Sequence, residues 1–145
     1  MKWNKKFNLT TKLAYIAGLV DGKGCIRIKH SNKQGNSYYV TMTISLNNAP
    51  ALEFIKNGFG GKIYKKERGF QYYLASGEAI DFLKSILSYL IIKRSEAELA
   101  IEFSESYRFM DAITKQNYYT DMRKLKHIKP MVLSNIWENK ELLKG

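Results

Sequence analysis

The sequence has little cysteine and proline, few acidic residues relative to basic ones, and no long hydrophobic run. Because Cys25 is the only cysteine, no internal disulfide can form, which is typical of a reducing intracellular compartment. The apolar runs fall well short of the roughly 20 residues that a membrane-spanning helix needs. No apolar segment follows the basic N-terminus, so no signal peptide is predicted. We therefore expect a protein of the cytoplasm, or of an organelle if it is encoded there, without a membrane partner.

Basic residues greatly outnumber acidic ones. The 145-residue chain has 24 Lys and Arg against 13 Asp and Glu, which gives a net charge of +11. Such an excess indicates the kind of partner rather than the fold. Nucleic acid is the first candidate, and an anionic membrane surface is the second. The hydrophobic content of 45% and the length together predict one globular domain spanning residues 1–145.

The rest of the chain is organised around the stretch of residues 13–24. Leu13, Ile16, Ala17 and Val20 follow the i, i+3, i+4, i+7 spacing that is typical of one apolar stripe on a helix. This stretch is too short to cross a bilayer. It is therefore predicted to be a helix that packs within a globular domain.

Both ends of this helix have local signals. Thr10 or Thr11 is expected to cap its start, because a threonine hydroxyl can accept a hydrogen bond from a free backbone N–H of the first turn. Gly22 and Gly24 are expected to end it, because glycine adopts the left-handed conformation without steric cost.

Small side chains lie on neighbouring turns of this helix, at Ala14, Ala17 and Gly18. Residues of this size would let another backbone approach closely. On pattern alone, a core helix with a glycine defect explains them equally well.

A signature that resembles that of the LAGLIDADG homing endonucleases spans residues 16–24, Ile-Ala-Gly-Leu-Val-Asp-Gly-Lys-Gly, and departs from it only at Lys23. The resemblance implies that two copies of the helix pack against each other, as in the single-motif homodimers of the family. The dimer interface implied in this way consists of Leu13, Ala14, Ala17, Gly18 and Asp21.

The same resemblance implies a catalytic centre at the end of the helix. In the family, the next-to-last residue of the signature is an acid that holds a divalent metal, expected to be Mg²⁺, at the scissile phosphates. Lys23 takes that position here, so no metal is expected in this chain, and Asp21 is only a weak candidate ligand. Two further catalytic positions carry over. They are Lys93, for which an ordinary exposed lysine is the alternative, and Asn48, or Asn47 if the register differs by one.

Alternation of apolar and polar residues predicts two β-hairpins. Residues 25–31 and 37–46 alternate on either side of a polar turn. Residues 62–66 and 71–74 alternate in the same way. Each hairpin would have one apolar face and one face of cations, hydroxyls and tyrosines.

Helical periodicity follows each predicted hairpin. One helix is predicted between Pro50 and Gly58, and two more at about residues 76–90 and 95–107. The resulting order is the one expected for the LAGLIDADG fold. This is an α+β fold of αββαββα order, in which a four-stranded antiparallel DNA-binding sheet has helices packed on one face.

The resemblance covers a core of about residues 10–107. Residues 108–145 have no usable signature and are expected to form a C-terminal helical extension laid against that core. A basic run at residues 123–129 is predicted to lie near the DNA backbone, with a solvated charge run as the alternative. A last amphipathic segment follows at about residues 132–143.

The polar face of the two hairpins is the candidate DNA-reading surface. A sheet can lay one face in the major groove, where side chains at every second residue reach base edges. Arg27 is the best candidate for a bidentate guanine contact, whereas lysines more often contact phosphates. Plain solvent exposure is the alternative explanation of a polar face. The predicted DNA-binding residues are Arg27, Lys29, Ser31, Tyr39, Thr41, Thr43, Ser45, Lys62, Tyr64, Lys66, Gln71 and Tyr73.

Together these observations predict a homodimeric LAGLIDADG-type homing endonuclease that recognises a long, roughly palindromic DNA duplex. Phosphodiester hydrolysis is expected to be absent or impaired because of Lys23. One alternative is a non-cleaving binding module, an intron splicing helper or a repressor, that uses the same sheet on RNA or DNA. Another is an unrelated basic enzyme or membrane-surface protein. Lys23 favours the binding module, whereas Lys93 and Asn48 favour descent from an active nuclease.

Overall fold

A computed structural model describes residues 8–32 and 37–127 of the chain. The helices and strands, in chain order, are α1 (Leu9–Lys23), β1 (Gly24–Ser31), β2 (Ser37–Leu46), α2 (Ala49–Phe59), β3 (Lys62–Lys66), β4 (Gly69–Ala75), α3 (Ser76–Ile86), α4 (Arg94–Ser106) and α5 (Ala112–Leu125). Short 3-10 turns, η1 (Leu87–Tyr89) and η2 (Tyr107–Phe109), follow α3 and α4. The N-terminus, the end of the basic run and the last amphipathic segment lie outside the described residues.

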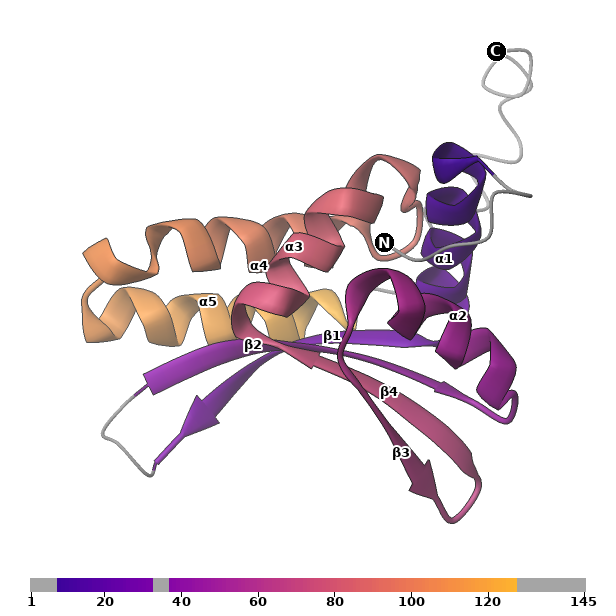
Figure 1. Ribbon diagram of the computed structural model, residues 1–145. Coiled ribbons are helices and arrows are strands. Elements are labelled where there is room, and N and C mark those ends of the chain that lie inside the picture. Colours follow the sequence, from indigo (N-terminus) through magenta and orange to yellow (C-terminus); the bar gives the residue numbers. More distant parts are fainter. Residues whose placement is uncertain (1–7, 33–36, 128–145) are drawn as a thin grey trace.

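The four strands form one antiparallel sheet in the order β1-β2-β4-β3, so β1 and β3 are its edges. The helices lie on one side of this sheet, and the opposite side, here called the outer face, is open (Figure 1). The predicted α+β fold and its order of elements are confirmed. The bounds of β2 and β3 agree with the alternating runs at residues 37–46 and 62–66.

The alternation within each strand decides which side chains enter the core. In β1, Ile26 and Ile28 are 0% and 4% exposed, whereas Arg27 and Lys29 between and after them are exposed. Full burial of one large apolar side chain contributes about 1.5–3 kcal/mol to stability. The core side of the sheet consists of Ile26, Ile28, Tyr38, Val40, Met42, Ile44, Tyr72 and Leu74. The helices pack against it through Ile16, Val20, Leu52, Ile55, Phe82, Leu83, Ala100 and Phe103.

The ends of α1 differ from the prediction. Its N-cap is Asn8, whose Oδ1 accepts a hydrogen bond from the backbone N–H of Thr11 at 2.7 Å, so the predicted threonine cap was wrong. Gly22 lies inside the helix, and Gly24 is extended with φ of −88°, so the predicted left-handed ending was also wrong. Gly24 is required for space instead, because a Cβ atom there would lie 2.7 Å from the carbonyl oxygen of Val20.

Helix α5 packs along β1 and α4 at the side of the sheet away from β3 (Figure 1). Met122 anchors it with a side chain that is 1% exposed. Tyr38 donates a hydrogen bond to Oε1 of Gln116 at 2.5 Å, and Tyr118 donates one to Glu102 at 2.9 Å. The start of the predicted extension is therefore packed against the core. None of the described helices is long and apolar enough to cross a membrane.

Candidate nucleic-acid interface

The strand register places all of the predicted DNA-binding residues on the outer face. Directly paired residues of an antiparallel sheet point to the same side. One such row crosses all four strands from Cys25 through Thr43 and Tyr73 to Lys62. Every second residue from this row shares its face. The face therefore includes Arg27, Lys29, Ser31, Tyr39, Thr41, Thr43, Ser45, Lys62, Tyr64, Lys66, Gln71 and Tyr73. Their contact with DNA stays a prediction.

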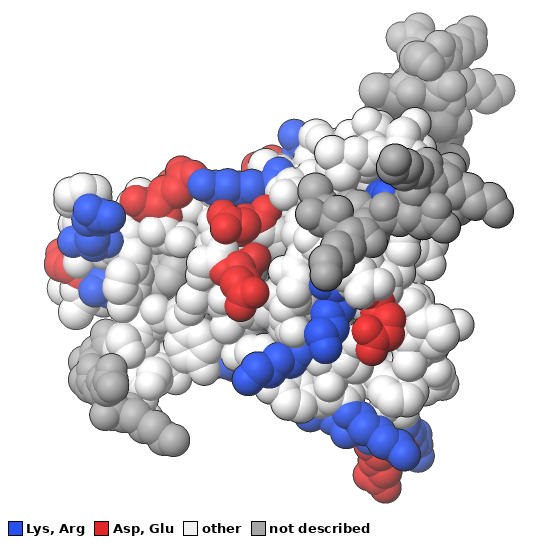
Figure 2. Space-filling view, viewed as in Figure 1, with Lys and Arg blue, Asp and Glu red and all other residues white. Residues whose placement is uncertain are grey.

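The outer face is positively charged. Its strand residues include the cations Arg27, Lys29, Lys62 and Lys66 and no carboxylate. Figure 2 shows basic side chains grouped at the free end of the β3–β4 hairpin, with acidic atoms at its tip, whereas most acidic side chains in this view lie over the helices. A surface with this charge is suited to a polyanion.

Three tyrosines add polar aromatic groups to the outer face. The rings of Tyr64 and Tyr73 are 6.3 Å apart in a T-shaped arrangement, and Nζ of Lys66 lies 5.7 Å from the centre of the Tyr64 ring. Burial, and then the neighbouring Tyr39 and Tyr64, raise the pKa of Tyr73. The Tyr73 hydroxyl therefore keeps its proton and can donate a hydrogen bond to a base or phosphate.

Thr41 differs from the other outer-face residues. It pairs with Arg27 on one side and Ala75 on the other, and its side chain is only 1% exposed. Among the described residues, its Oγ1 is the buried side-chain oxygen that lacks a hydrogen-bond partner. A buried hydroxyl cannot reach a base edge, so the prediction of Thr41 as a direct contact was wrong.

Lys23 is the last residue of α1, and its side chain is exposed. A cation at this end of a helix is favoured by about 0.3–1 kcal/mol, because the free carbonyl groups carry partial negative charge. Within residues 8–32 and 37–127, no hydrogen bond or ion pair involves its ammonium group. The charge of Lys23 is therefore available to a phosphate.

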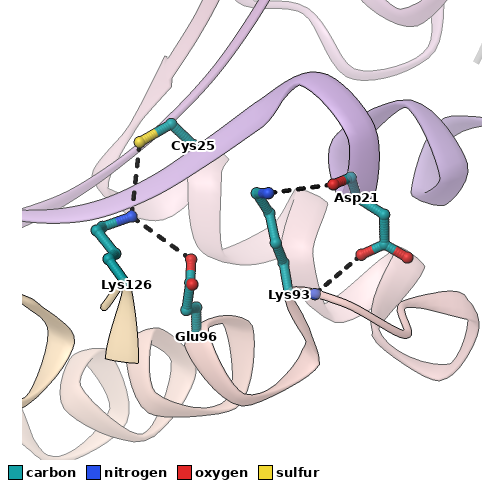
Figure 3. A network of polar contacts seen from close by, with 5 residues as sticks. All are labelled: Asp21, Cys25, Lys93, Glu96 and Lys126. Atoms are coloured by element: carbon teal, nitrogen blue, oxygen red, sulfur yellow. Dashed lines mark hydrogen bonds and ion pairs between the residues drawn. The ribbon is translucent and has the colours of Figure 1, made fainter. Parts of the chain in front are cut away.

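Asp21 organises the loop that precedes α4. Its carboxylate accepts three backbone hydrogen bonds, from the N–H groups of Ile91 at 2.9 Å, Ile92 at 3.1 Å and Lys93 at 3.0 Å. Figure 3 shows the carboxylate of Asp21 turned toward the backbone of Lys93. The acid therefore holds residues 91–93 against the end of α1, although these residues are distant in the sequence.

Lys93 returns the contact with its side chain. It is half-buried, and its Nζ donates a hydrogen bond to the backbone carbonyl of Asp21 at 3.1 Å (Figure 3). This carbonyl belongs to the last turn of α1, where oxygens lack partners within the helix. Lys93 thus contacts Asp21, the residue two positions before Lys23 on α1. Its catalytic role stays a prediction.

The residues at this place do not fit a magnesium ion. Magnesium takes oxygen ligands, usually carboxylates with at least one free lone pair. Lys23 supplies none, and the Asp21 carboxylate accepts three backbone N–H donors that hold it toward residues 91–93 and use most of its acceptor capacity. Asp21 as a metal ligand is therefore not supported by its contacts.

Asn48 has a structural role that its predicted catalytic role did not include. It is the N-cap of α2, and its Oδ1 accepts a hydrogen bond from the backbone N–H of Ala51 at 3.1 Å. Asn47 is exposed and continues the outer-face alternation one residue beyond β2. The catalytic role of Asn48, with Asn47 as the alternative, stays a prediction.

Only part of the predicted dimer interface lies on the exposed side of α1. Ala14 and Gly18 are exposed, and no atom lies within 4 Å of a Cβ placed on Gly18. Ala17 is 0% exposed and belongs to the core of its own chain, so its place in the interface was wrong. Leu13 packs partly against that core. The Asp21 carboxylate is committed to the loop before α4.

Sequence reasoning missed other exposed residues on this side. Gly22 is exposed, with no atom within 4 Å of an added Cβ, and it continues the Ala14–Gly18 spacing by one turn. Ile91 and Ile92 are 79% and 62% exposed beside the end of α1. Gly22 could have been found from helical spacing, whereas Ile91 and Ile92 lie outside any periodic pattern.

Comparison with known proteins gives one family match. The family described as LAGLIDADG endonuclease matches residues 16–125, well over half of the chain. Among curated protein sequences, none matches.

Solved structures share the fold. The homing endonuclease I-CvuI, in complex with its target in the presence of calcium, is 21% identical with a TM-score of 0.72. The match covers 83% of this chain and 85% of that one. The archaeal intron-encoded homing endonuclease I-Vdi141I, complexed with DNA, is 18% identical with a TM-score of 0.69. The match covers 81% of this chain and 86% of that one.

A third similar structure has a longer chain. The LAGLIDADG meganuclease I-AabMI, bound to uncleaved DNA, is 22% identical with a TM-score of 0.64. The match covers 88% of this chain but only 49% of that one. The family match, together with this shared fold, identifies the chain as a member of the LAGLIDADG endonuclease family.

Proposed function

We propose that this protein is a homing endonuclease by descent that binds a specific DNA duplex through the outer face of its sheet and cuts it poorly or not at all. The observation that carries the proposal is that the polar outer face of the sheet adjoins Lys23, the last residue of α1, which directly precedes β1. The polar face supports DNA binding, and the lysine in place of an acid argues against DNA cutting.

The outer face has the features that base reading in a major groove requires. Long polar side chains alternate along four strands, and the exposed ones include Arg27, which can donate two parallel hydrogen bonds to guanine. Lys62 and Lys66 are exposed on the β3 edge and are suited to phosphates. The I-CvuI and I-Vdi141I structures are themselves complexes with DNA, which supports the same partner for this chain.

Loss of cutting follows from the chemistry at the end of α1. Hydrolysis of a phosphodiester needs a Lewis acid that polarises the phosphate and activates water. Divalent metals are expected to provide this in the family, and the I-CvuI complexes were studied in the presence of Ca or Mg. Lys23 brings a positive charge that can bind a phosphate oxygen but cannot ionise a water molecule. Asp21 is occupied by backbone donors, so it does not replace the missing acid.

The functional unit is proposed to be a homodimer joined through α1. Thr11, Ala14, Gly18 and Gly22 form an exposed stripe of small residues at i, i+3, i+7 and i+11. A second α1 packed there would place two copies of Lys23 near the centre of the complex. The 49% coverage of the I-AabMI chain agrees with a unit that contains two such folds.

A non-cleaving splicing helper or repressor is the second candidate. Lys23 favours it, because such a protein needs the binding surface but no metal. It predicts binding to structured RNA at least as tight as binding to duplex DNA.

Binding measurements test both proposals. A DNA site is first selected from a randomised duplex library, and its affinity is then measured in a series of KCl concentrations with Mg²⁺ or with EDTA. We expect binding that needs no Mg²⁺ and weakens steeply with salt, by about 0.9 in the log–log slope for each phosphate contacted. A flat salt response would contradict the nucleic-acid proposal, and a preference for RNA would favour the splicing helper.

A further inference from the structure

A groove of about 490 Å³ lies between the edge strand β1 and helix α5, at the border of the outer face. Five basic side chains line it, which are Arg27, Lys29, His30, Arg123 and Lys126. The first three come from β1 and the other two from the end of α5. A surface of this charge next to an edge strand is not needed to hold the fold together.

The fold positions the α5 side of the groove. Tyr119, Met122, Arg123 and Lys126 follow i, i+3, i+4, i+7 spacing, so they share one face of the helix. Met122 is buried and fixes this face toward β1. The guanidinium carbon of Arg123 lies 5.8 Å from the centre of the Tyr119 ring, so the arginine rests on an aromatic surface at the groove.

Acidic residues neutralise little of this charge. Lys126 is 3.5 Å from a carboxylate oxygen of Glu96 and also 3.5 Å from Sγ of Cys25 (Figure 3). Within the described residues, neither Arg27 nor Arg123 has an ion pair. Asp121 is on the same helix, but its charge acts on Tyr118, outside the groove. The cations therefore repel one another until an anion enters.

The position and charge of the groove indicate which kind of anion it would bind. Arg27 and Lys29 belong to the outer face as well as to the groove, so the two surfaces are continuous along β1. The two side chains stand about 6.8 Å apart along the strand, since each residue advances about 3.4 Å. Arg123 and Lys126 face them from α5. Cations on both walls of a groove suit an extended chain of negative charges better than a single ion.

We propose that the β1–α5 groove holds the sugar–phosphate backbone of the same DNA duplex whose bases face the sheet. This inference rests on the proposed function and adds a second contact surface to it. Phosphate contacts of this kind fix the orientation of a protein on DNA without reading sequence. The groove would thus set the register in which the outer face meets the bases.

The first test removes one groove cation and measures salt dependence. Arg123→Gln is compared with Arg108→Gln, an equal change of charge at an exposed residue of η2 that does not line the groove. The probe is a 30-base-pair duplex of random sequence. Arg123→Gln is expected to lower the slope of log K against log salt by about 0.9, and Arg108→Gln to leave it unchanged. Thermal melting should be the same for both variants, because both side chains are exposed.

The second test should strengthen binding. Glu96→Gln removes the carboxylate that pairs with Lys126, and Glu105→Gln removes the one that pairs with Lys84 at 3.0 Å on the α3–α4 side. We expect Glu96→Gln to raise the affinity for the same duplex by about two- to fivefold, since the partly buried Lys126–Glu96 pair no longer competes with the phosphate. Glu105→Gln should have no effect. A residue that only supports the fold would not improve binding when it is changed.

The outcomes separate the two proposals. If Arg123→Gln leaves the slope unchanged while Lys66→Gln lowers it, the outer face binds DNA and the groove does not, which overturns this inference alone. If the unchanged protein shows no salt-dependent binding, the proposed function fails and the inference fails with it. If only the slope for an RNA hairpin falls in Arg123→Gln, the groove serves RNA and the inference is wrong.

Discussion

At the scale of single residues, the first acid of the signature has a structural task rather than a chemical one. The Asp21 carboxylate holds residues 91–93 through three backbone N–H groups, and Lys93 binds the Asp21 carbonyl in return. This reciprocal contact joins the end of α1 to the loop that precedes α4. Asp21 is therefore a positioning residue for Lys93.

Removal of the Asp21 carboxylate should destabilise the protein. Asp21→Ala removes the charged acceptor of three backbone N–H groups, of which the one on Lys93 is partly buried, and we expect the free energy of unfolding to fall by about 1–3 kcal/mol in urea denaturation. Asp21→Asn keeps one oxygen and should lose less. Asp81→Ala, at an exposed acid on α3, is the control and should stay within about 0.5 kcal/mol of the unchanged protein. Equal stability of Asp21→Ala and Asp81→Ala would show that the hydrogen bonds to the Asp21 carboxylate do not stabilise the fold.

Gly24 provides a second prediction at this scale. A Cβ atom there would lie 2.7 Å from the Val20 carbonyl oxygen and 2.9 Å from its Cα, and both are backbone atoms that cannot move independently. Gly24→Ala should therefore lower the free energy of unfolding by about 1–3 kcal/mol. Gly77→Ala meets no atom within 4 Å and should be neutral or slightly stabilising. Chemical denaturation of both variants checks this, and a Gly24→Ala protein as stable as Gly77→Ala would refute it.

At the scale of elements, periodicity could predict which residues form the strands and helices. Apolar residues at every second position predicted β1, β2 and β3, because one side of a sheet must face the core. The same pattern could not predict the burial of Thr41, which depends on the neighbouring strands. Nor could spacing within α1 tell that Ala17 faces its own core while Gly18 faces outward.

Long-range polar contacts also could not be predicted from the sequence. The contact between Asp21 and residues 91–93 joins segments that no local pattern relates. The capping role of Asn48 was readable in principle, since it directly precedes a helix with Pro50 in its first turn.

The open side of α1 leads to a prediction with two opposite effects. Gly18→Leu replaces a poor helix former where no atom lies within 4 Å, so the isolated chain should gain roughly 0.5–1 kcal/mol. The same leucine should prevent two α1 helices from approaching and shift the protein from dimer to monomer in sedimentation. Gly77→Leu, in an equally open position on α3, should leave assembly unchanged. An unchanged dimer for Gly18→Leu would place the dimer interface elsewhere.

At the scale of the whole molecule, charge and symmetry support the proposal that this member of an endonuclease family binds DNA without cutting it. The net charge of +11 attracts a polyanion over the whole surface, and the outer face concentrates cations without a carboxylate. In a homodimer both copies carry Lys23, so neither strand of the duplex would meet a complete catalytic centre. We therefore expect a single substitution, at Lys23, to separate binding from cutting.

The most direct test of this account compares the unchanged protein with Lys23→Asp on a duplex that contains the selected site. Binding and strand breaks are measured together on gels, in Mg²⁺ and in EDTA. We predict that the unchanged protein binds in both conditions and leaves the DNA intact. Lys23→Asp should cut both strands in Mg²⁺ only, and should bind more weakly in EDTA because two central cations become two anions. Efficient cleavage by the unchanged protein in Mg²⁺ would contradict the account.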